Sequence, residues 1–180
     1  MSARSEALFV GGRSGAGKSS VGNEIHAQLS AAGVRHCLID GDFLDMAHPP
    51  PWEHGLAERN LAAMWANYRA LGYRRMIYIN TASVFDDVLD QLTAAMGDRP
   101  KVTAVLLTCT DETARRRLSQ REIGSALDRH LERSAATARE VSSGAPHWVH
   151  RLPTDDRSVA EIATEITGLV GWLPPDPPDD

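Results

Sequence analysis

Eight residues near the start of the chain combine glycines, a lysine and a serine at a spacing that suits phosphate binding. The segment 12–19 reads GRSGAGKS. Glycines let backbone N–H groups surround an anion, Lys18 can reach the outer phosphates of a nucleotide, and the Ser19 hydroxyl is a ligand for Mg²⁺. An apolar run at 7–10 precedes the segment and a helix-like stretch follows it, so a helix N-terminus would face the same anion. The segment therefore predicts a phosphate-binding loop (P-loop), because a plain glycine-rich turn would not need the Lys-Ser pair.

The P-loop predicts most of a nucleotide-binding site. The residues that we expect to contact the nucleotide are Gly12, Ser14, Gly15, Ala16, Gly17, Lys18, Ser19 and Ser20.

Two carboxylates, Asp40 and Asp42, follow a second apolar run and are separated by Gly41. In an open parallel sheet the ligand crevice lies over the carboxyl ends of the strands, where a P-loop also lies. One carboxylate could hold magnesium while the other accepts the proton of an attacking hydroxyl, and Asp42 is the better candidate for the base, supported by Asp40. The expected metal ligands are Ser19, Asp40 and Asp42. The alternative is a turn at a helix start, where carboxylates are common caps.

Apolar runs alternate with helix-like stretches along the chain, a pattern typical of an α/β fold with a parallel sheet. The pattern predicts five parallel strands with helices on both faces, a three-layer sandwich of the P-loop NTPase type. Strands are expected at about 6–11, 35–40, 75–80, 101–108 and 147–152, and helices at about 19–32, 56–71, 84–96, 111–120, 127–141 and 159–169. We expect one domain over 1–173 and a mobile tail over 174–180, which contains only proline and aspartate.

Composition excludes several classes of protein. The net charge of −5 over 180 residues argues against a general nucleic-acid binder. No apolar run approaches the ~20 residues of a membrane helix, and residues 1–6 lack the apolar core of a signal peptide, so we expect no membrane partner and a cytoplasmic protein. Cys37 and Cys109 lack metal-site spacing and are expected to be small buried residues. The sequence leaves open whether the chain forms a homodimer.

The P-loop, the Asp40-Gly41-Asp42 motif, the size and the strand–helix order resemble the small P-loop kinases, most closely adenylylsulfate kinase, over about residues 6–170. Gluconate kinases, shikimate kinases and phosphotransferases of the chloramphenicol type use similar scaffolds. The chain departs from adenylylsulfate kinase on the acceptor side. Asp45 replaces an arginine, and the helix that keeps Glu58 and Asn60 lacks the paired arginines. The kinase half therefore matches the family better than the acceptor half.

The resemblance also implies a lid rich in arginine at about 117–133, which would close over ATP. Arg117 and Arg121 share a helix face and are the arginines that we expect to contact phosphate. A solvated helix face is the competing interpretation, because acidic residues lie among the arginines. Thr154 and Arg157 follow the last strand, where similar kinases pack the adenine base.

The acceptor pocket is expected between the ends of the second and third strands and the helix that begins near Leu56. Its candidate lining is Phe43, Trp52, Arg59, Asn60, Asn80 and Ser83. The two aromatic residues and the prolines at 49–51 indicate a shaped wall, although a rigid surface loop would have the same composition.

These features predict a kinase that uses ATP and Mg²⁺ to phosphorylate a hydroxyl of a small molecule. The alternatives are a strict adenylylsulfate kinase and a slowly hydrolysing nucleotide switch that acts through a protein partner.

Overall fold

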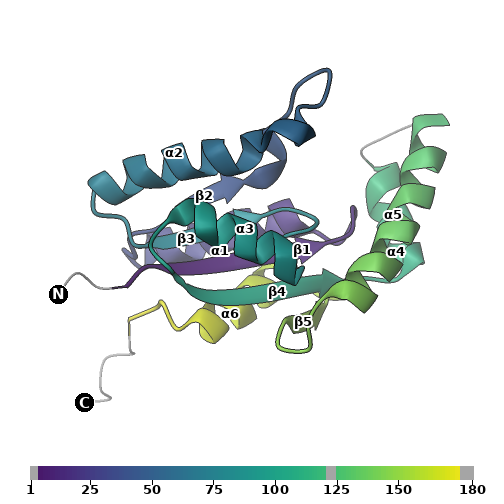
Figure 1. Cartoon of the computed structure of the whole chain (residues 1–180). Helices are drawn as coiled ribbons and strands as arrows, with labels where there is room; N and C mark the ends of the chain where they lie inside the picture. The colour runs from purple at the N-terminus through teal and green to yellow at the C-terminus, as the bar shows by residue number, and fades with distance from the viewer. Residues whose placement is uncertain (1–3, 121–124, 175–180) are drawn as a thin grey trace, which may run out of the picture.

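The computed structural model describes residues 4–120 and 125–174, which fold around a single parallel sheet (Figure 1). All strand pairings are parallel, and the strand order is β2-β3-β1-β4-β5. The strands are β1 (Glu6–Gly12), β2 (Cys37–Asp40), β3 (Arg75–Ile79), β4 (Lys101–Thr108) and β5 (His150–Pro153). The central strand β1 has its side chains at 8–10 fully buried, as expected for a strand covered on both faces. The predicted α/β class and the five-stranded parallel sheet are confirmed.

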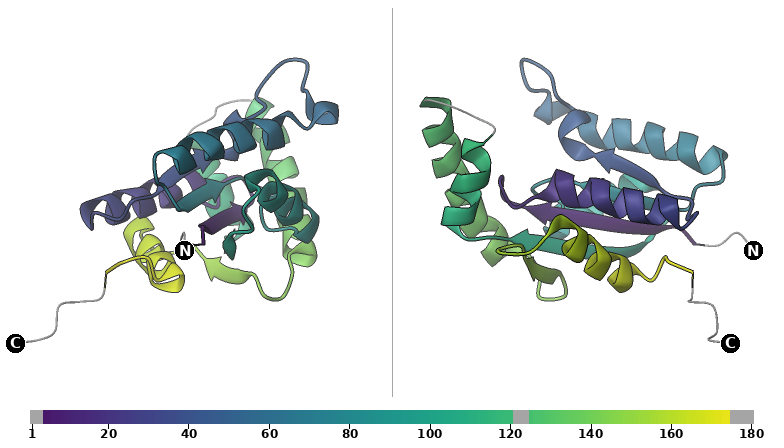
Figure 2. Two further views of the ribbon diagram at one scale, coloured as in Figure 1. Left: turned by 60° about the vertical axis from the view of Figure 1, so that its left-hand side comes forward. Right: turned by 180° about the vertical axis from the view of Figure 1, so that it is seen from behind.

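Helices cover both faces of this sheet. Seen from behind, α1 and α6 lie over one face (Figure 2), while α2, α3 and the end of α5 pack over the other. The α-helices are α1 (Lys18–Ala31), α2 (Leu56–Ala70), α3 (Asp86–Met96), α4 (Asp111–Ser119), α5 (Ser125–Gly144) and α6 (Val159–Val170). Two short 3-10 segments, η1 (Gly41–Phe43) and η2 (Trp52–His54), lie between β2 and α2.

Each face has its own apolar core. Ile25 and Leu29 of α1 and Ile166 of α6 are fully buried against one face of the sheet. Leu61 and Trp65 of α2 are buried against the other face. Burial of side chains of this size stabilises the fold by about 1.5–3 kcal/mol each, which holds both helical layers against the sheet.

Local capping fixes where two of the helices near the site begin. The Thr110 hydroxyl accepts a hydrogen bond from the Thr113 N–H at 3.2 Å and begins α4. Ser158 and Glu161 form a reciprocal capping box at the start of α6, with Glu161 accepting from the Ser158 N–H at 2.8 Å. Asp155 links the two regions, because its carboxylate accepts the Thr110 N–H at 3.0 Å.

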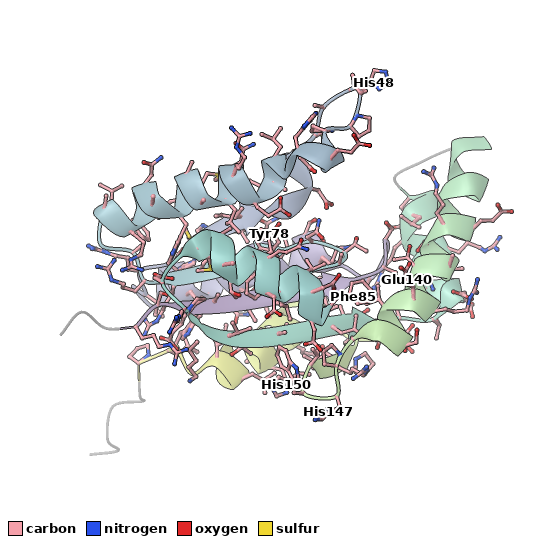
Figure 3. All side chains as sticks on the ribbon, viewed as in Figure 1. His48, Tyr78, Phe85, Glu140, His147 and His150 are labelled. Carbon is pink, nitrogen blue, oxygen red and sulfur yellow. The ribbon has the colours of Figure 1, made fainter. Side chains whose placement is uncertain are left out.

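Three boundaries, the end of α5 and the starts of β5 and α3, differ from the prediction for physical reasons. Helix α5 continues to Gly144 and β5 begins only at His150, because residues 146–149 form a turn closed by the Val149 N–H and the Pro146 carbonyl. Phe85 packs against this end of α5, where a Cβ on Gly144 would lie 2.6 Å from its ring (Figure 3). Helix α3 begins at Asp86 rather than 84, because the Phe85 N–H bonds to Ala82 in a tight turn.

The remaining expectations concern the cysteines, membrane helices, the lid and the C-terminal tail. Cys37 is buried, and burial raises the pKa of its thiol to about 12, whereas Cys109 lies just beyond β4 and is only half-buried. No helix in the two described ranges is long and apolar enough to cross a bilayer. Residues 121–124 of the expected lid and 175–180 of the expected tail lie outside the described residues.

Candidate active site

The carboxyl ends of all five strands lie at one edge of the sheet, as parallel pairing requires. The P-loop follows β1, Asp40 ends β2 and Asn80 follows β3. Thr110 and Thr154 follow β4 and β5 at the same edge. Helices α4 and α5 stand beyond this edge, at the end toward which the strand arrows point (Figure 1). The predicted site residues therefore come together from distant parts of the chain.

The P-loop has the backbone shape that its glycines allow. Gly15 and Gly17 adopt φ values of 86° and 100°. Gly15 also packs against α4, because a Cβ at this position would lie 3.0 Å from the Cα of Ala114. The Lys18 ammonium donates to the Gly12 carbonyl at 2.8 Å and to the Arg13 carbonyl at 3.3 Å. The lysine thus lies along its own loop, where it can exchange these carbonyls for phosphate oxygens.

Arg117 joins the P-loop to the loop after β5. Its guanidinium donates to the carbonyls of Gly15 at 3.1 Å and Ala16 at 3.3 Å. It also donates to the Thr154 hydroxyl at 2.9 Å and to the Thr154 carbonyl at 2.8 Å. Arg117 therefore does not belong to a solvated helix face, which was the competing interpretation. The sequence did not predict its bonds to the P-loop and to Thr154. Its neighbours Arg115 and Arg116 are exposed.

A cavity of about 190 Å³ lies beside this junction. Its walls come from the P-loop and the start of α1, the end of α4, and the segment that leads into α6. The lining includes Gly15, Ala16, Gly17, Ser20, Arg117, Gln120, Thr154, Arg157 and Val159. Arg157 is held by Glu165 of α6 at 2.6 Å. Thr154 and Arg157 thus lie beside the P-loop around one cavity with polar and apolar walls.

Arg13 has a structural role that sequence reasoning missed. Only 4% of Arg13 is exposed, and its Nε donates to the Ser134 hydroxyl of α5 at 2.9 Å. Ser134 in turn donates to the Ser14 carbonyl at 2.7 Å, while the guanidinium of Arg13 also pairs with Asp111. This pairing holds the pKa of Asp111 below its usual range. The position of an arginine inside the P-loop was the available signal.

The Asp40-Gly41-Asp42 segment forms the start of η1. Asp40 accepts the Asp42 N–H at 3.1 Å, so the capping interpretation is correct for this carboxylate. Asp42 is exposed, and one of its oxygens accepts a hydrogen bond from the Asn80 side chain at 2.8 Å. Burial raises the pKa of Asp40, and the charge of Asp42 raises it further, while Lys18 lowers it. Asp40 ends β2 and the P-loop follows β1, so both lie at the same edge of the sheet.

The other predicted acceptor residues have different environments. Asn60 donates to the Leu44 carbonyl at 2.6 Å and thereby ties α2 to the segment after η1. Ser83 is fully buried and donates to the Asn80 carbonyl at 2.9 Å, so its hydroxyl supports the Asn80 turn and does not face a ligand. Phe43 is 69% exposed and forms no enclosed aromatic wall. Arg59 is also exposed.

The side chains of two predicted site residues, Arg121 and Trp52, are not described by the structure. Arg121 lies outside the described residues, and Trp52 contributes the backbone of η2 but its side chain is not described. The loop that carries His48 projects outward before α2 (Figure 3).

Tyr78 of β3 lies at the same edge and was not predicted. A Cβ on Gly41 would lie 2.3 Å from the Tyr78 hydroxyl, so only glycine allows η1 to pass over this ring. Figure 3 shows Tyr78 beneath α2. Only 3% of Tyr78 is exposed; burial raises the pKa of its hydroxyl, and the charges of Glu58, Asp42, Asp45 and Asp40 raise it further.

The described residues contain no cluster of three or more His, Cys, Asp or Glu side chains that could cage a metal ion alone. Mg²⁺ bound with a nucleotide needs no such cluster, since it takes one or two protein ligands and fills its other positions with phosphates and water. Ser19 is exposed in the first turn of α1, Asp40 ends β2 and Asp42 lies in η1 at the same edge of the sheet. These oxygens fit such an ion.

The family model for adenylylsulphate kinase matches residues 4–49, which contain the P-loop and the Asp40-Gly41-Asp42 segment. The fold is one that solved small P-loop kinases also have. The chain is similar to the adenylylsulfate kinase of Mycobacterium tuberculosis, solved with AMPPNP and APS, at 20% identity and a TM-score of 0.59, covering 93% of this chain and 98% of that one. It is also similar to a tunicamycin resistance protein of Deinococcus radiodurans, at 16% identity and a TM-score of 0.66, covering 96% of this chain and 100% of that one.

A gluconokinase of Sinorhizobium meliloti is similar at 22% identity and a TM-score of 0.56, with 93% of each chain covered. No curated protein sequence matches the chain significantly. The structural similarity therefore extends over nearly the whole small P-loop kinase fold, whereas the match to a sequence family is confined to the P-loop and the first part of the acceptor edge.

Proposed function

We propose that this protein is a kinase that transfers the γ-phosphoryl group of ATP to a hydroxyl of a small molecule. The observation that carries the proposal is that the P-loop with Lys18 follows β1 at the edge where Asp40 ends β2 and where Asn80 anchors Asp42. A phosphate-binding lysine beside a pair of carboxylates supplies both charge stabilisation and a proton acceptor, which phosphoryl transfer needs.

The nucleotide would bind across the P-loop, with its phosphates on the loop and its nucleoside in the cavity beside Arg117 and Thr154. Lys18 would leave the Gly12 and Arg13 carbonyls and donate to the outer phosphates. Arg117 would fix the position of the P-loop relative to the Thr154 wall of the cavity, because its guanidinium already donates to both. In this arrangement the γ-phosphoryl group would lie at the carboxyl edge of β1 and would face η1.

The acceptor hydroxyl would attack the γ-phosphorus from the η1 side. As its oxygen forms the new bond, the bond to the bridging oxygen of ADP breaks, and the proton of the hydroxyl passes to the Asp42 carboxylate. Asn80 would orient Asp42 by its hydrogen bond to one oxygen, which leaves the second oxygen to face the acceptor. Mg²⁺, held by Ser19 with Asp40 and Asp42, would supply positive charge to the phosphates when it is bound.

The proposal is tested by incubating the protein with ATP labelled in its γ-phosphoryl oxygens and a collection of hydroxyl compounds, with detection of labelled products by mass spectrometry. Asp42→Asn should lower the transfer rate about 10²–10⁴-fold, the range for loss of a general base, and should bind ATP normally. Asp90→Asn removes an exposed carboxylate from α3 and serves as the matched control. Transfer by Asp42→Asn at the wild-type rate would exclude the role of Asp42.

A strict adenylylsulfate kinase is the second candidate, because the family match covers residues 4–49. The collection of acceptors must therefore contain adenylylsulfate. Phosphorylation of this compound alone would favour the second candidate, and phosphorylation of another hydroxyl would exclude it.

A further inference from the structure

The carboxyl edge of the sheet has opposite charges on its two sides. The nucleotide side carries Arg13, Lys18, Arg117 and Arg157. The segment 40–60 on the other side holds five carboxylates, one arginine and two histidines. An anionic acceptor such as a sulfonucleotide or a sugar acid would have to approach this second side against its charge.

A buried polar group lies among these carboxylates. The Tyr78 hydroxyl lies against Gly41, between Asp40 and Asp42 in the chain, and Tyr78 is 3% exposed. It makes no hydrogen bond within the part of the chain that the structure describes. The bond from Asn60 to the Leu44 carbonyl holds the start of α2, with Glu58, against the segment that contains Asp45, and both carboxylates raise the pKa of the Tyr78 hydroxyl. The ring is buried while the hydroxyl at its end is not fully enclosed, so a ligand or water can supply the missing hydrogen-bond partner.

The amide donors of this edge already have partners. The Asn80 amide donates to Asp42, and the Asn60 amide donates to the Leu44 carbonyl. The side-chain groups left to bind the acceptor at this edge are oxygens. They are the second oxygen of Asp42, the carboxylates of Asp45 and Glu58, and the Tyr78 hydroxyl. Such a set suits a group that only donates hydrogen bonds, and a primary ammonium has three donors and no acceptor.

We infer that the acceptor of the proposed kinase is a hydroxyl compound that also carries an ammonium group, bound by Glu58, Asp45 and Tyr78. This inference rests on the proposed function. The ammonium nitrogen binds and does not react; the hydroxyl of the same molecule forms the bond to phosphorus, and its proton passes to Asp42. Amino sugars and amino alcohols belong to this class. Arg59, the one arginine of the segment, is exposed, and its charge is outnumbered by the carboxylates around it.

The inference is tested without choosing a compound in advance. A small-molecule cell extract is separated by ion exchange at pH 7 into compounds of net positive, zero and net negative charge. Each fraction is incubated with the protein and ATP labelled in its γ-phosphoryl oxygens, with Lys18→Ala as the inactive control. We expect labelled product from the positive fraction, at least tenfold more than from the others.

Labelled product mainly from the neutral or negative fraction would overturn the inference and leave the kinase proposal standing. No labelled product from any fraction would contradict the kinase proposal, and the inference would fall with it. The two failures are thus distinguishable in one experiment.

Variants test the assigned residues on the product so identified. Glu58→Gln and Tyr78→Phe should each raise the KM for the acceptor about five- to tenfold and change the KM for ATP less than about twofold, as expected for a lost charged or hydroxyl contact. Phenylalanine keeps the ring of Tyr78 in the core, so the variant should fold. Asp90→Asn should change neither constant. An unchanged KM for the acceptor in both Glu58→Gln and Tyr78→Phe would overturn the assignment.

Discussion

Arg117 gives the sharpest prediction about how the nucleotide cavity is built. Replacing it with methionine keeps much of its length and removes its guanidinium. The structure gives this group hydrogen bonds to the carbonyls of Gly15, Ala16 and Thr154 and to the Thr154 hydroxyl. All three residues line the adjoining cavity, but only Gly15 is partly exposed, so water can readily replace the guanidinium at its carbonyl. Thr154 is only 1% exposed, so its carbonyl would lose its charged donor without replacement.

The expected loss of stability follows from this difference. An unsatisfied buried carbonyl costs about 1–3 kcal/mol, and we take about 2 kcal/mol for the Thr154 carbonyl with some relaxation of the loop. For a protein of this length each kcal/mol lowers the Tm by about 2–4 °C, so Arg117→Met should melt about 4–8 °C below the wild type. The Kd for a non-hydrolysable ATP analogue should rise about tenfold, which corresponds to about 1.4 kcal/mol.

The measurements are thermal unfolding by circular dichroism and titration calorimetry with the analogue. Arg116→Met removes the same charge from the same helix at an exposed position and is the matched control. It should match the wild type in both measurements. The reasoning fails if Arg117→Met melts within about 1 °C of Arg116→Met and binds the analogue equally well.

Three further variants test other parts of the structure. Gly15→Ala should lose at least about 1 kcal/mol of unfolding free energy and most ATP affinity, because φ is 86° and the new Cβ would meet Ala114; urea unfolding and calorimetry measure both. Ser134→Ala should lose about 1 kcal/mol and weaken ATP binding, since Arg13 and the P-loop share its hydroxyl; equal ATP affinity would exclude this link. Burial lowers the pKa of His36, so stability should fall as pH decreases from about 6.5 toward the folded-state pKa, where only the unfolded state binds the proton; in His36→Gln the Tm should depend less on pH, and an equal slope would contradict the assignment.

The sequence predicted the architecture well because parallel strands and amphipathic helices leave strong local patterns. All five strands were expected within a few residues of where they lie, and the P-loop was identified by residue types that few other motifs share. The start of β5 was placed too early because the apolar residues near 148 lie in a turn after Pro146, and periodicity alone does not distinguish a turn from a strand end.

The details of the site were harder to predict because they depend on contacts between distant residues. Arg13 pairs with Ser134 across more than a hundred positions, and no local pattern identifies Ser134 as its partner. Ser83 was expected to face a ligand but its hydroxyl supports a turn instead. Tyr78 was read as part of a buried strand, and its place under Gly41 follows only from the crossing of η1 over β3.

The central claim is that the edge formed by Lys18, Asp40 and Asp42 transfers a phosphoryl group to a hydroxyl. The most direct test is the transfer of label from γ-labelled ATP to a small molecule, measured in parallel for the wild type, Lys18→Ala and Asp42→Asn. The account predicts a labelled product from the wild type, little or none from either variant, and near-normal ATP binding by Asp42→Asn. Release of labelled phosphate to water alone, with no labelled product under any condition, would contradict it.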